Sequence, residues 1–550
     1  MSIPGYREMQ PGSIAKKERG TTLMTRKEFI RLLSAAMAMQ TGTQKSTAEV
    51  SRTGEPAVAG GRKRALQAGR DGQKRRPNVL IIMTDQHRRD YMGTTGHSPV
   101  STPNIDKIAS HGVRFTNAVC PYPVCAASRM SLMTALYPHS TGVINNSDRL
   151  AWNAQTIASH FSGLGYHTGL IGKAHFNDGH HHGFDYFLGF NDWFMYLGPQ
   201  VGRYADAIAN NPFNSRAFAS VDNNGAGFPE LPGVWGKERP WAGHVRRIGF
   251  ASEFDNTEDE FEAFVSRESS RFLERYGNDK APFLLIASFL RPHPPTHPPR
   301  EWADRYPPDR VDLPPVGDVT RYPGWIRKRV SMFQAEGSDR MRAYRAAYRG
   351  NLAYVDTCIG EVYSTLERLG LTKDTIVIYT ADHGEMDGDH GLYEKFCFFD
   401  PSIGVPLIVS QPGEFSEGKI CDALVEYFGI FPTIAELVGA PAPAGIEAKS
   451  FAAQVRDPSA SGADAQFAEY NLRSAHDCYM VRTQRYKYNY NHNDIAELYD
   501  LEADPGEMVN QAGNPSFTRI QNELHDRLMA WYNPMTNPYR KELMTQSSSL

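Results

Sequence analysis

From Asn78 onward, the sequence alternates short runs of β-branched and apolar residues with longer amphipathic stretches. This alternation is typical of an α/β fold with a largely parallel sheet, in which helices connect consecutive strands. The runs that we predict to be buried strands are residues 79–83, 168–171, 283–287, 375–379 and 405–409. The stretches that we predict to be helices are residues 103–110, 128–136, 154–163, 341–369 and 431–438.

The chain divides into three predicted parts. Residues 1–76 are rich in Gly, Ser, Thr, Ala, Lys and Arg and have little to bury, so we expect them to be disordered. Residues 77–440 carry the α/β pattern and form the predicted catalytic domain. In residues 441–550, the runs 478–482 and 486–491 and the segment ELYDLEADPGE predict a small antiparallel sheet, and residues 517–532 predict a final helix.

The first part contains a candidate export signal. Residues 25–39 pair a basic start with a short apolar segment, and Ala57-Val58-Ala59 is a small-residue pattern that a signal peptidase could cut. The segment resembles a twin-arginine signal with Lys27 in place of the second arginine. It predicts a periplasmic or secreted protein, and the alternative is a basic tail on a cytoplasmic one.

Composition excludes several classes of protein. The net charge of −3 gives no electrostatic basis for binding nucleic acid. No apolar stretch approaches the roughly 20 residues that span a bilayer, so we expect a soluble body with no membrane span. Six cysteines in 550 residues do not form a disulfide framework.

Polar side chains follow four of the predicted strands at the point where each strand ends. Ligands of an open parallel sheet bind outside the carboxyl ends of its strands, so we expect these side chains to converge on one crevice. The residues in question are Asp85, Gln86, Lys173, His175, His293, Asp382 and His383.

Cys125 lies just before a predicted helix, in the run Cys-Ala-Ala-Ser-Arg. The exposed N–H groups and the dipole at a helix N-terminus favour an anion, and they would lower the pKa of a thiol placed there. Arg129 falls one turn further along the same helix, where it can hold an oxygen-rich group. Cys125 is therefore the candidate nucleophile.

Together these segments resemble the sulfatase family of the alkaline-phosphatase superfamily. The resemblance runs from Asn78 to about Asn510, in the order and spacing of the family. It implies a large mixed, mostly parallel sheet flanked by helices, with a smaller C-terminal antiparallel sheet. The segments that carry it are NVLIIMTDQ, TPNIDKIASHGVRFTNA, CAASRMSLMTALYPHSTGV, GKAHF, SFLRPHPP, TADHGE, HGLYEKF and ELYDLEADPGE.

The resemblance implies that a maturation enzyme oxidises Cys125 to formylglycine. One hydroxyl of the hydrated aldehyde would attack the sulfur of a sulfate ester, and deprotonation of the other would expel sulfate. Arg129 would orient this diol, and Lys173 and Lys395 would bind the sulfate oxygens. His175 would be the base, and His293 the acid that protonates the departing alcohol.

The resemblance also implies one divalent metal ion, held by Asp85, Gln86, Asp382 and His383. Calcium is the ion that the family suggests. However, an amide and an imidazole in place of carboxylates weaken the case for calcium and admit Mn²⁺ or Zn²⁺. The same Gln and His occur in phosphonate-monoester and phosphodiester hydrolases of the superfamily, so hydrolysis of such an ester by the same site is the alternative activity.

The sequence leaves the maturation enzyme and the roles of several side chains open. Position 127 is Ala where many members carry Pro, so more than one kind of maturation enzyme could recognise the site. An inactive protein that binds sulfated glycans would have broken catalytic positions, and none is visible. Cys120 and Cys125 could instead form a disulfide. The residues His180, His181 and His182 suggest either a polar loop near the substrate or a second metal site.

The predicted substrate is a sulfated saccharide, with a small aryl or alkyl sulfate as the alternative. Residues 198–251 lack periodicity and are predicted to form an irregular insertion over one face of the sheet, where substrate contacts often lie. Aromatic side chains in and beside the insertion either stack on sugar rings or pack it against the core. They are Trp193, Phe194, Tyr196, Trp235 and Trp241.

Overall fold

The computed structural model describes residues 75–198, 257–294 and 296–539, and the structural statements below concern these residues. The candidate export signal and most of the predicted insertion, with Trp235 and Trp241, lie outside them. Among the described residues, no helix has the length and apolar character that a membrane span requires.

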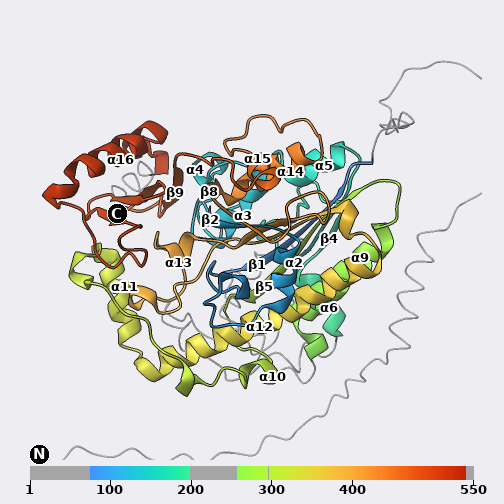
Figure 1. Cartoon of the computed structure of the whole chain (residues 1–550), viewed down its shortest axis with the longest axis horizontal. Helices are drawn as coiled ribbons and strands as arrows, with labels where there is room; N and C mark the ends of the chain where they lie inside the picture. The colour runs from blue at the N-terminus through green and yellow to red at the C-terminus, as the bar shows by residue number, and fades with distance from the viewer. Residues whose placement is uncertain (1–74, 199–256, 295, 540–550) are drawn as a thin grey trace, which may run out of the picture. The chain divides into compact units, whose positions relative to one another are not determined.

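The sheet at the centre of the described chain (Figure 1) has eight strands, in the order β4-β3-β5-β1-β6-β7-β2-β8. All neighbouring pairs are parallel except those of β7, which runs antiparallel to both β6 and β2. The predicted α/β fold with a mostly parallel sheet is confirmed. The strands are β1 (Asn78–Asp85), β2 (Gly112–Val119), β3 (His167–Gly172), β4 (Tyr186–Leu188), β5 (Phe283–Pro292), β6 (Thr375–Ala381), β7 (Leu407–Ser410) and β8 (Lys419–Glu426).

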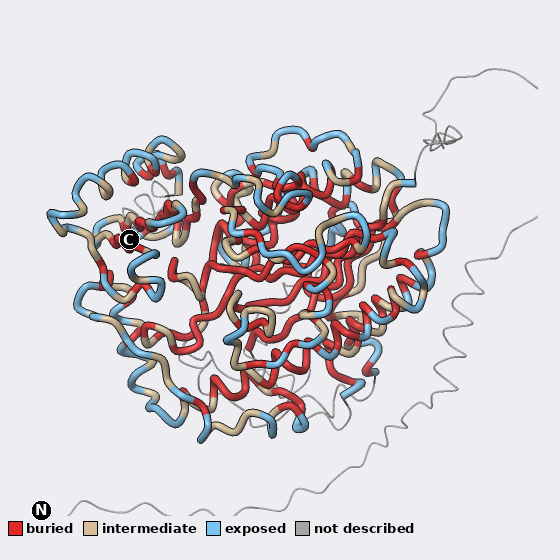
Figure 2. The backbone as a smooth tube through the Cα atoms, viewed as in Figure 1, coloured by how far each residue is buried: buried red, intermediate tan, exposed pale blue. Residues whose placement is uncertain are grey.

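Helices cover both faces of this sheet (Figure 1). On the central strand β1, Val79, Ile81 and Met83 pack with α3 (Cys125–Thr134), α5 (Ile157–Gly163) and α14 (Ile430–Leu437). Leu80 and Ile82 pack on the other face with α2 (Pro103–Ser110), α9 (Phe261–Tyr276) and α12 (Ser338–Arg368). The alternation follows from the two-residue period of a strand, and β1 is apolar throughout because both of its faces are covered. Figure 2 shows the resulting pattern, with buried strands inside and exposed residues on the outer helical surfaces.

Most predicted helices are found within a few residues of their predicted ends. The helix after the candidate nucleophile begins at Cys125 itself, three residues before its predicted start. The helices are α2 (Pro103–Ser110), α3 (Cys125–Thr134), α4 (Pro138–Thr141), α5 (Ile157–Gly163), α6 (Phe190–Leu197), α9 (Phe261–Tyr276), α10 (Arg300–Ala303), α11 (Gly324–Gln334), α12 (Ser338–Arg368), α13 (Asp400–Ile403), α14 (Ile430–Leu437), α15 (Ala452–Arg456) and α16 (Thr518–Trp531).

The C-terminal part forms a separate four-stranded antiparallel sheet, as predicted, in the order β12-β11-β10-β9. The change from one sheet to the other falls between β8 and β9, and the predicted domain boundary at residue 440 lies in this interval and stays a prediction. The strands are β9 (Gln466–Tyr470), β10 (Cys478–Arg482), β11 (Tyr486–Asn491) and β12 (Glu497–Asp500).

A buried ion cluster joins the C-terminal sheet to the main sheet. Lys487 on β11 is fully buried, and its ammonium group contacts Asp400 at the start of α13 and, at 2.7 Å, Glu507. Asp400 also accepts from Arg89 at 2.7 Å. Burial favours protonation of Asp400, but the surrounding cations, Lys487 among them, hold its pKa well below the ordinary value.

We predict that Lys487→Met lowers the free energy of unfolding by about 3–5 kcal/mol, because it leaves the buried Glu507 without its cation and removes one of the cations that contact Asp400. Urea denaturation measures this loss. The matched control is Arg485→Met on the adjacent turn, which removes the half-exposed partner of Asp500 and should cost much less stability than the loss of the fully buried Lys487. Equal losses in the two variants would contradict a structural role for the buried cluster.

Candidate active site

The sheet order places the four predicted polar clusters at one edge. Strands β3, β5, β1 and β6 are consecutive neighbours and all parallel, so their carboxyl ends lie side by side. Asp85 ends β1, and Lys173, His293 and Asp382 each directly follow one of the other three strands. These side chains are 0–2% exposed, so the cluster is buried.

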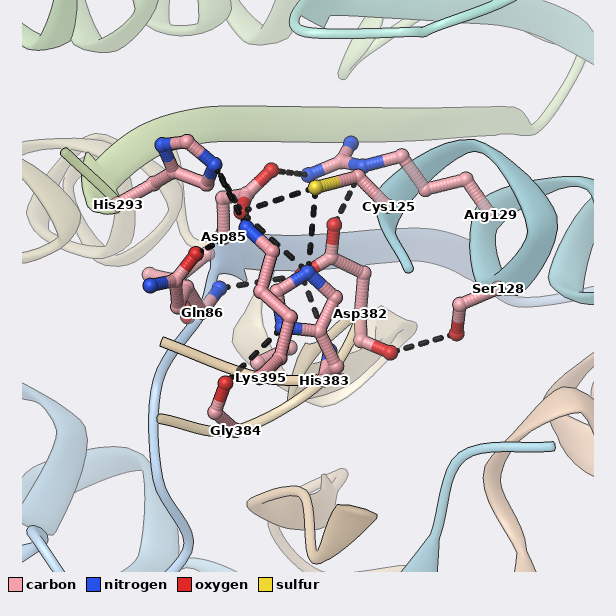
Figure 3. A network of polar contacts seen from close by, with 12 residues as sticks. Asp85, Gln86, Cys125, Ser128, Arg129, His293, Asp382, His383, Gly384 and Lys395 are labelled. Atoms are coloured by element: carbon pink, nitrogen blue, oxygen red, sulfur yellow. Dashed lines mark hydrogen bonds and ion pairs between the residues drawn. The ribbon is translucent and has the colours of Figure 1, made fainter. Parts of the chain in front are cut away.

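Asp85 lies at the centre of the cluster (Figure 3). Its Oδ2 accepts from Lys173 Nζ at 2.5 Å and from Arg129 Nη2 at 3.0 Å. Its Oδ1 lies 3.8 Å from His383 Nε2 and 3.9 Å from His293 Nε2. Burial alone would favour the protonated acid, but Lys173 and the other cationic groups hold the pKa of Asp85 well below its usual range. Asp85 is therefore a carboxylate.

Arg129 connects helix α3 to the ends of three strands. Its Nε donates to Asp382 at 2.8 Å, and its Nη1 donates to the Lys173 carbonyl at 2.6 Å and to Ser288 Oγ at 2.8 Å. With the bond to Asp85, one planar guanidinium group holds two predicted metal ligands in place. The predicted contact of Arg129 with a diol on residue 125 stays a prediction.

Cys125 is the first residue of α3, and its thiol faces the carboxyl ends of β1 and β6 (Figure 3). Its Sγ lies 3.2 Å from His383 Nε2 and 3.7 Å from Asp85 Oδ1. Burial and Asp85 raise the pKa of this thiol, but Lys173, Lys395 and His383 outweigh them, so that its pKa lies below the ordinary value. The pKa of each of the other five cysteines is raised, chiefly by burial.

The donor set fits a divalent cation. One ligand atom each from Asp85, Cys125, Asp382 and His383 lies within 4.8 Å of the others. Gln86 lies beside them, since its main-chain N–H donates to Asp382 Oδ1 at 3.1 Å, and its side-chain Oε1 accepts from Lys395 Nζ. Two carboxylates, an amide oxygen and an imidazole nitrogen suit a borderline ion better than calcium, which prefers oxygen ligands alone.

His293 and Lys395 form a second pair beside Gln86. His293 Nδ1 lies 2.6 Å from the Pro294 carbonyl, which can only accept, so Nδ1 carries the hydrogen. The lone pair on Nε2 then accepts from Lys395 Nζ at 2.9 Å. Burial and the charge of Lys395 hold the pKa of His293 well below the ordinary value.

His175 is oriented by a residue that the sequence did not single out. Its Nε2 donates to the Asn146 carbonyl at 3.2 Å, and Asn146 Oδ1 accepts from Ala126 N–H at the start of α3. Asn177 donates to the same carbonyl at 2.7 Å. Burial, with Lys173 and Arg129, lowers the pKa of His175, which leaves Nδ1 with its lone pair. No local sequence signal marks Asn146, because it meets His175 only through the fold.

The structure also bears on three further expectations, which concern a disulfide, a second metal site and an aromatic sugar contact. The Cys120–Cys125 disulfide is wrong, because all six cysteines lie in the described ranges and are free thiols. Among the described residues, one group of side chains could hold a metal ion, and the histidines at positions 180–182 are not part of it. A second metal site at these histidines is therefore not supported. Trp193 is buried and donates to the Asp259 carbonyl at 2.8 Å, so it packs in the core and does not face a sugar.

Comparison with known proteins gives consistent results. The family model described as Sulfatase matches residues 77–440, and that of the N-sulphoglucosamine sulphohydrolase C-terminal region matches residues 388–533. An arylsulfatase of Clostridium perfringens is 29% identical over 448 residues, which cover 79% of this chain and 90% of that protein. An N-acetylglucosamine-6-O-sulfatase of Bacteroides thetaiotaomicron is 26% identical over 489 residues, covering 82% and 85%.

Among solved structures, the phosphonate monoester hydrolase of Agrobacterium radiobacter superposes with a TM-score of 0.67 at 25% identity, covering 83% of this chain and 95% of that one. The predicted alkaline-phosphatase-like architecture is thereby confirmed. Since the Sulfatase match spans well over half of the chain, this protein belongs to the sulfatase family and is a sulfuric ester hydrolase.

Proposed function

We propose that this protein hydrolyses a sulfate ester on a saccharide, releasing alcohol and inorganic sulfate, with a formylglycine made from Cys125 as nucleophile. The observation that carries the proposal is the position of Cys125 at the start of α3, with its Sγ among the candidate metal ligands Asp85, Asp382 and His383. A group placed there would contact both the metal and the cationic side chains.

Two groups complete this site when present. Asp85, Gln86, Asp382 and His383 would hold one divalent metal ion, which polarises the sulfate oxygens and favours ionisation of the nucleophile. Formylglycine at position 125 supplies a hydrated aldehyde, whose second hydroxyl allows sulfate to leave.

The remaining roles belong to side chains already in place. Lys173 and Lys395 bring two positive charges beside residue 125, where they would bind sulfate oxygens and offset the charge that develops during the reaction. His175 has its Nδ1 lone pair free to take a proton from residue 125, since Nε2 is bonded to Asn146. Since His293 Nε2 carries no proton of its own, the proton that the departing alcoholate needs would come from Lys395 and pass through His293 Nε2.

A saccharide substrate is supported by one relative, the N-acetylglucosamine-6-O-sulfatase of Bacteroides thetaiotaomicron, and by one surface feature. A cavity of about 520 Å³ is lined by Trp152 and by His180, His181 and His182, on the loop that follows His175. The Trp152 side chain is 75% exposed, as a platform for a sugar ring would be.

We predict that protein produced with a formylglycine-generating enzyme carries the aldehyde at position 125 and releases sulfate from aryl and saccharide sulfates. Peptide mass mapping of the segment with Cys125 detects the conversion. Cys125→Ala should abolish turnover, and Cys125→Ser should stop after forming a stable ester. Active protein in which Cys125 is an unmodified thiol would refute the formylglycine mechanism.

We also predict that His293→Ala slows hydrolysis of alkyl and saccharide sulfates by about 10²–10⁴-fold, because their alcoholates require a proton on departure. With 4-nitrophenyl sulfate, whose leaving group is stable as an anion, the loss should be much smaller. The measurement is kcat/KM for both substrate types in the variant and in the unaltered protein. Equal losses for both would assign His293 a role other than general acid.

A second candidate activity is hydrolysis of phosphonate monoesters or phosphodiesters by the same site. Gln86, His383 and the likeness to the phosphonate monoester hydrolase favour it. We expect matured protein to prefer aryl sulfate over the aryl phosphate diester and phenylphosphonate ester of the same phenol, as judged by kcat/KM. A large preference for the phosphorus esters would make them the physiological class.

A further inference from the structure

Gln86 is held between two buried groups, the carboxyl group of Glu385 and the ammonium group of Lys395. Its Nε2 donates to Glu385 Oε2, and its Oε1 accepts from Lys395 Nζ. A carboxylate can only accept and an ammonium can only donate, so these partners determine which end of the amide points where. The Gln86 main chain is held as well, since its carbonyl accepts from the Tyr348 hydroxyl at 2.6 Å.

Glu385 is completely buried and surrounded by donors. Its Oε1 accepts from the main-chain N–H groups of Asp387 at 2.8 Å and Glu394 at 2.5 Å. Its Oε2 accepts from the Tyr344 hydroxyl at 3.2 Å and from Gln86. Every contact of this carboxyl group is therefore one in which it accepts, and the residue at position 86 has to supply a donor.

A carboxylate at position 86 would not satisfy this requirement. It would place two buried acceptor groups together with no hydrogen between them, and a buried acceptor without a donor costs more free energy than a hydrogen bond contributes. The amide avoids the conflict, because it donates to Glu385 with its nitrogen and keeps its oxygen on the side of Lys395 and the predicted metal ligands. Position 86 therefore contributes an oxygen without a negative charge.

We propose that Glu385 is a positioning residue that keeps position 86 an uncharged ligand, and so limits the metal ligands to two carboxylates, Asp85 and Asp382. This inference rests on the proposed function, in which those residues hold the metal. A site with two negative charges, an amide and an imidazole selects a borderline ion such as Mn²⁺ or Zn²⁺ over calcium. Glu385 thus determines metal selectivity without touching the ion.

The test is an exchange of the two side chains. Gln86→Glu, Glu385→Gln and the double variant Q86E/E385Q are stripped with a chelator and titrated with Mn²⁺ and Ca²⁺ by calorimetry. Each single variant should lose about 10–100-fold in Mn²⁺ affinity, as expected for the loss of an outer-shell partner. The double variant restores the donor–acceptor pair with a third carboxylate in the site, so it should bind Mn²⁺ more tightly than either single variant and favour calcium more than the unaltered protein does.

Glu426→Gln is the matched control. Glu426 is also a buried carboxyl group that accepts from a tyrosine hydroxyl and a main-chain N–H, those of Tyr137 and Phe467, and burial raises the pKa of both Glu426 and Glu385 to about 7. Because it lacks a contact with Gln86, its replacement should leave both metal affinities unchanged.

The inference is overturned if Q86E binds Mn²⁺ like the unaltered protein, or if the double variant binds no better than Q86E. If Q86E yields no folded protein, recovery of folded, metal-binding protein in the double variant supports the inference, and failure to recover it overturns the inference. Failure of the proposed function would show elsewhere, as matured unaltered protein that releases no sulfate.

Discussion

The ion bridge from Arg129 to Asp85 and Asp382 is the interaction on which the rest of the site depends. It ties the first turns of α3, and with them Cys125, to the ends of two adjacent strands. Two buried carboxylates this close would repel each other without a cation between them, and a buried arginine would be costly without its acceptors. The geometry of the candidate nucleophile and that of the candidate metal ligands therefore depend on each other.

The charges around Asp85 also determine how each neighbour titrates. Burial disfavours every charged form, yet Asp85 stays ionised because Lys173 and Arg129 contact the same oxygen. The same cations lower the pKa of His175. One compact arrangement thus keeps the predicted base neutral and the predicted metal ligand charged, which is what the proposed chemistry needs from each.

Much of the fold and of the candidate site could be predicted from local pattern. The strand that ends in Asp85 is an unbroken apolar run, and such a run is typical of a strand that is covered on both faces. Strand β8 was not predicted, because its exposed and buried residues follow no simple alternation. The residue run 405–409 was recognised as a strand, but nothing in it shows that β7 runs antiparallel to its neighbours, since direction is decided by the connection and the pairing partner.

The sequence by itself determined the chemical types at the strand ends, the candidate nucleophile and the family. A buried strand followed by a polar residue is a local pattern, and the motifs are contiguous in the chain. Only the tertiary structure decided which partners these residues meet: Asn146 against His175, Lys395 against His293, and Glu385 against Gln86, 299 positions away in the chain. Such pairs are selected by burial, because a polar group removed from water must find its partner wherever the fold brings one, and sequence distance places no limit on where that is.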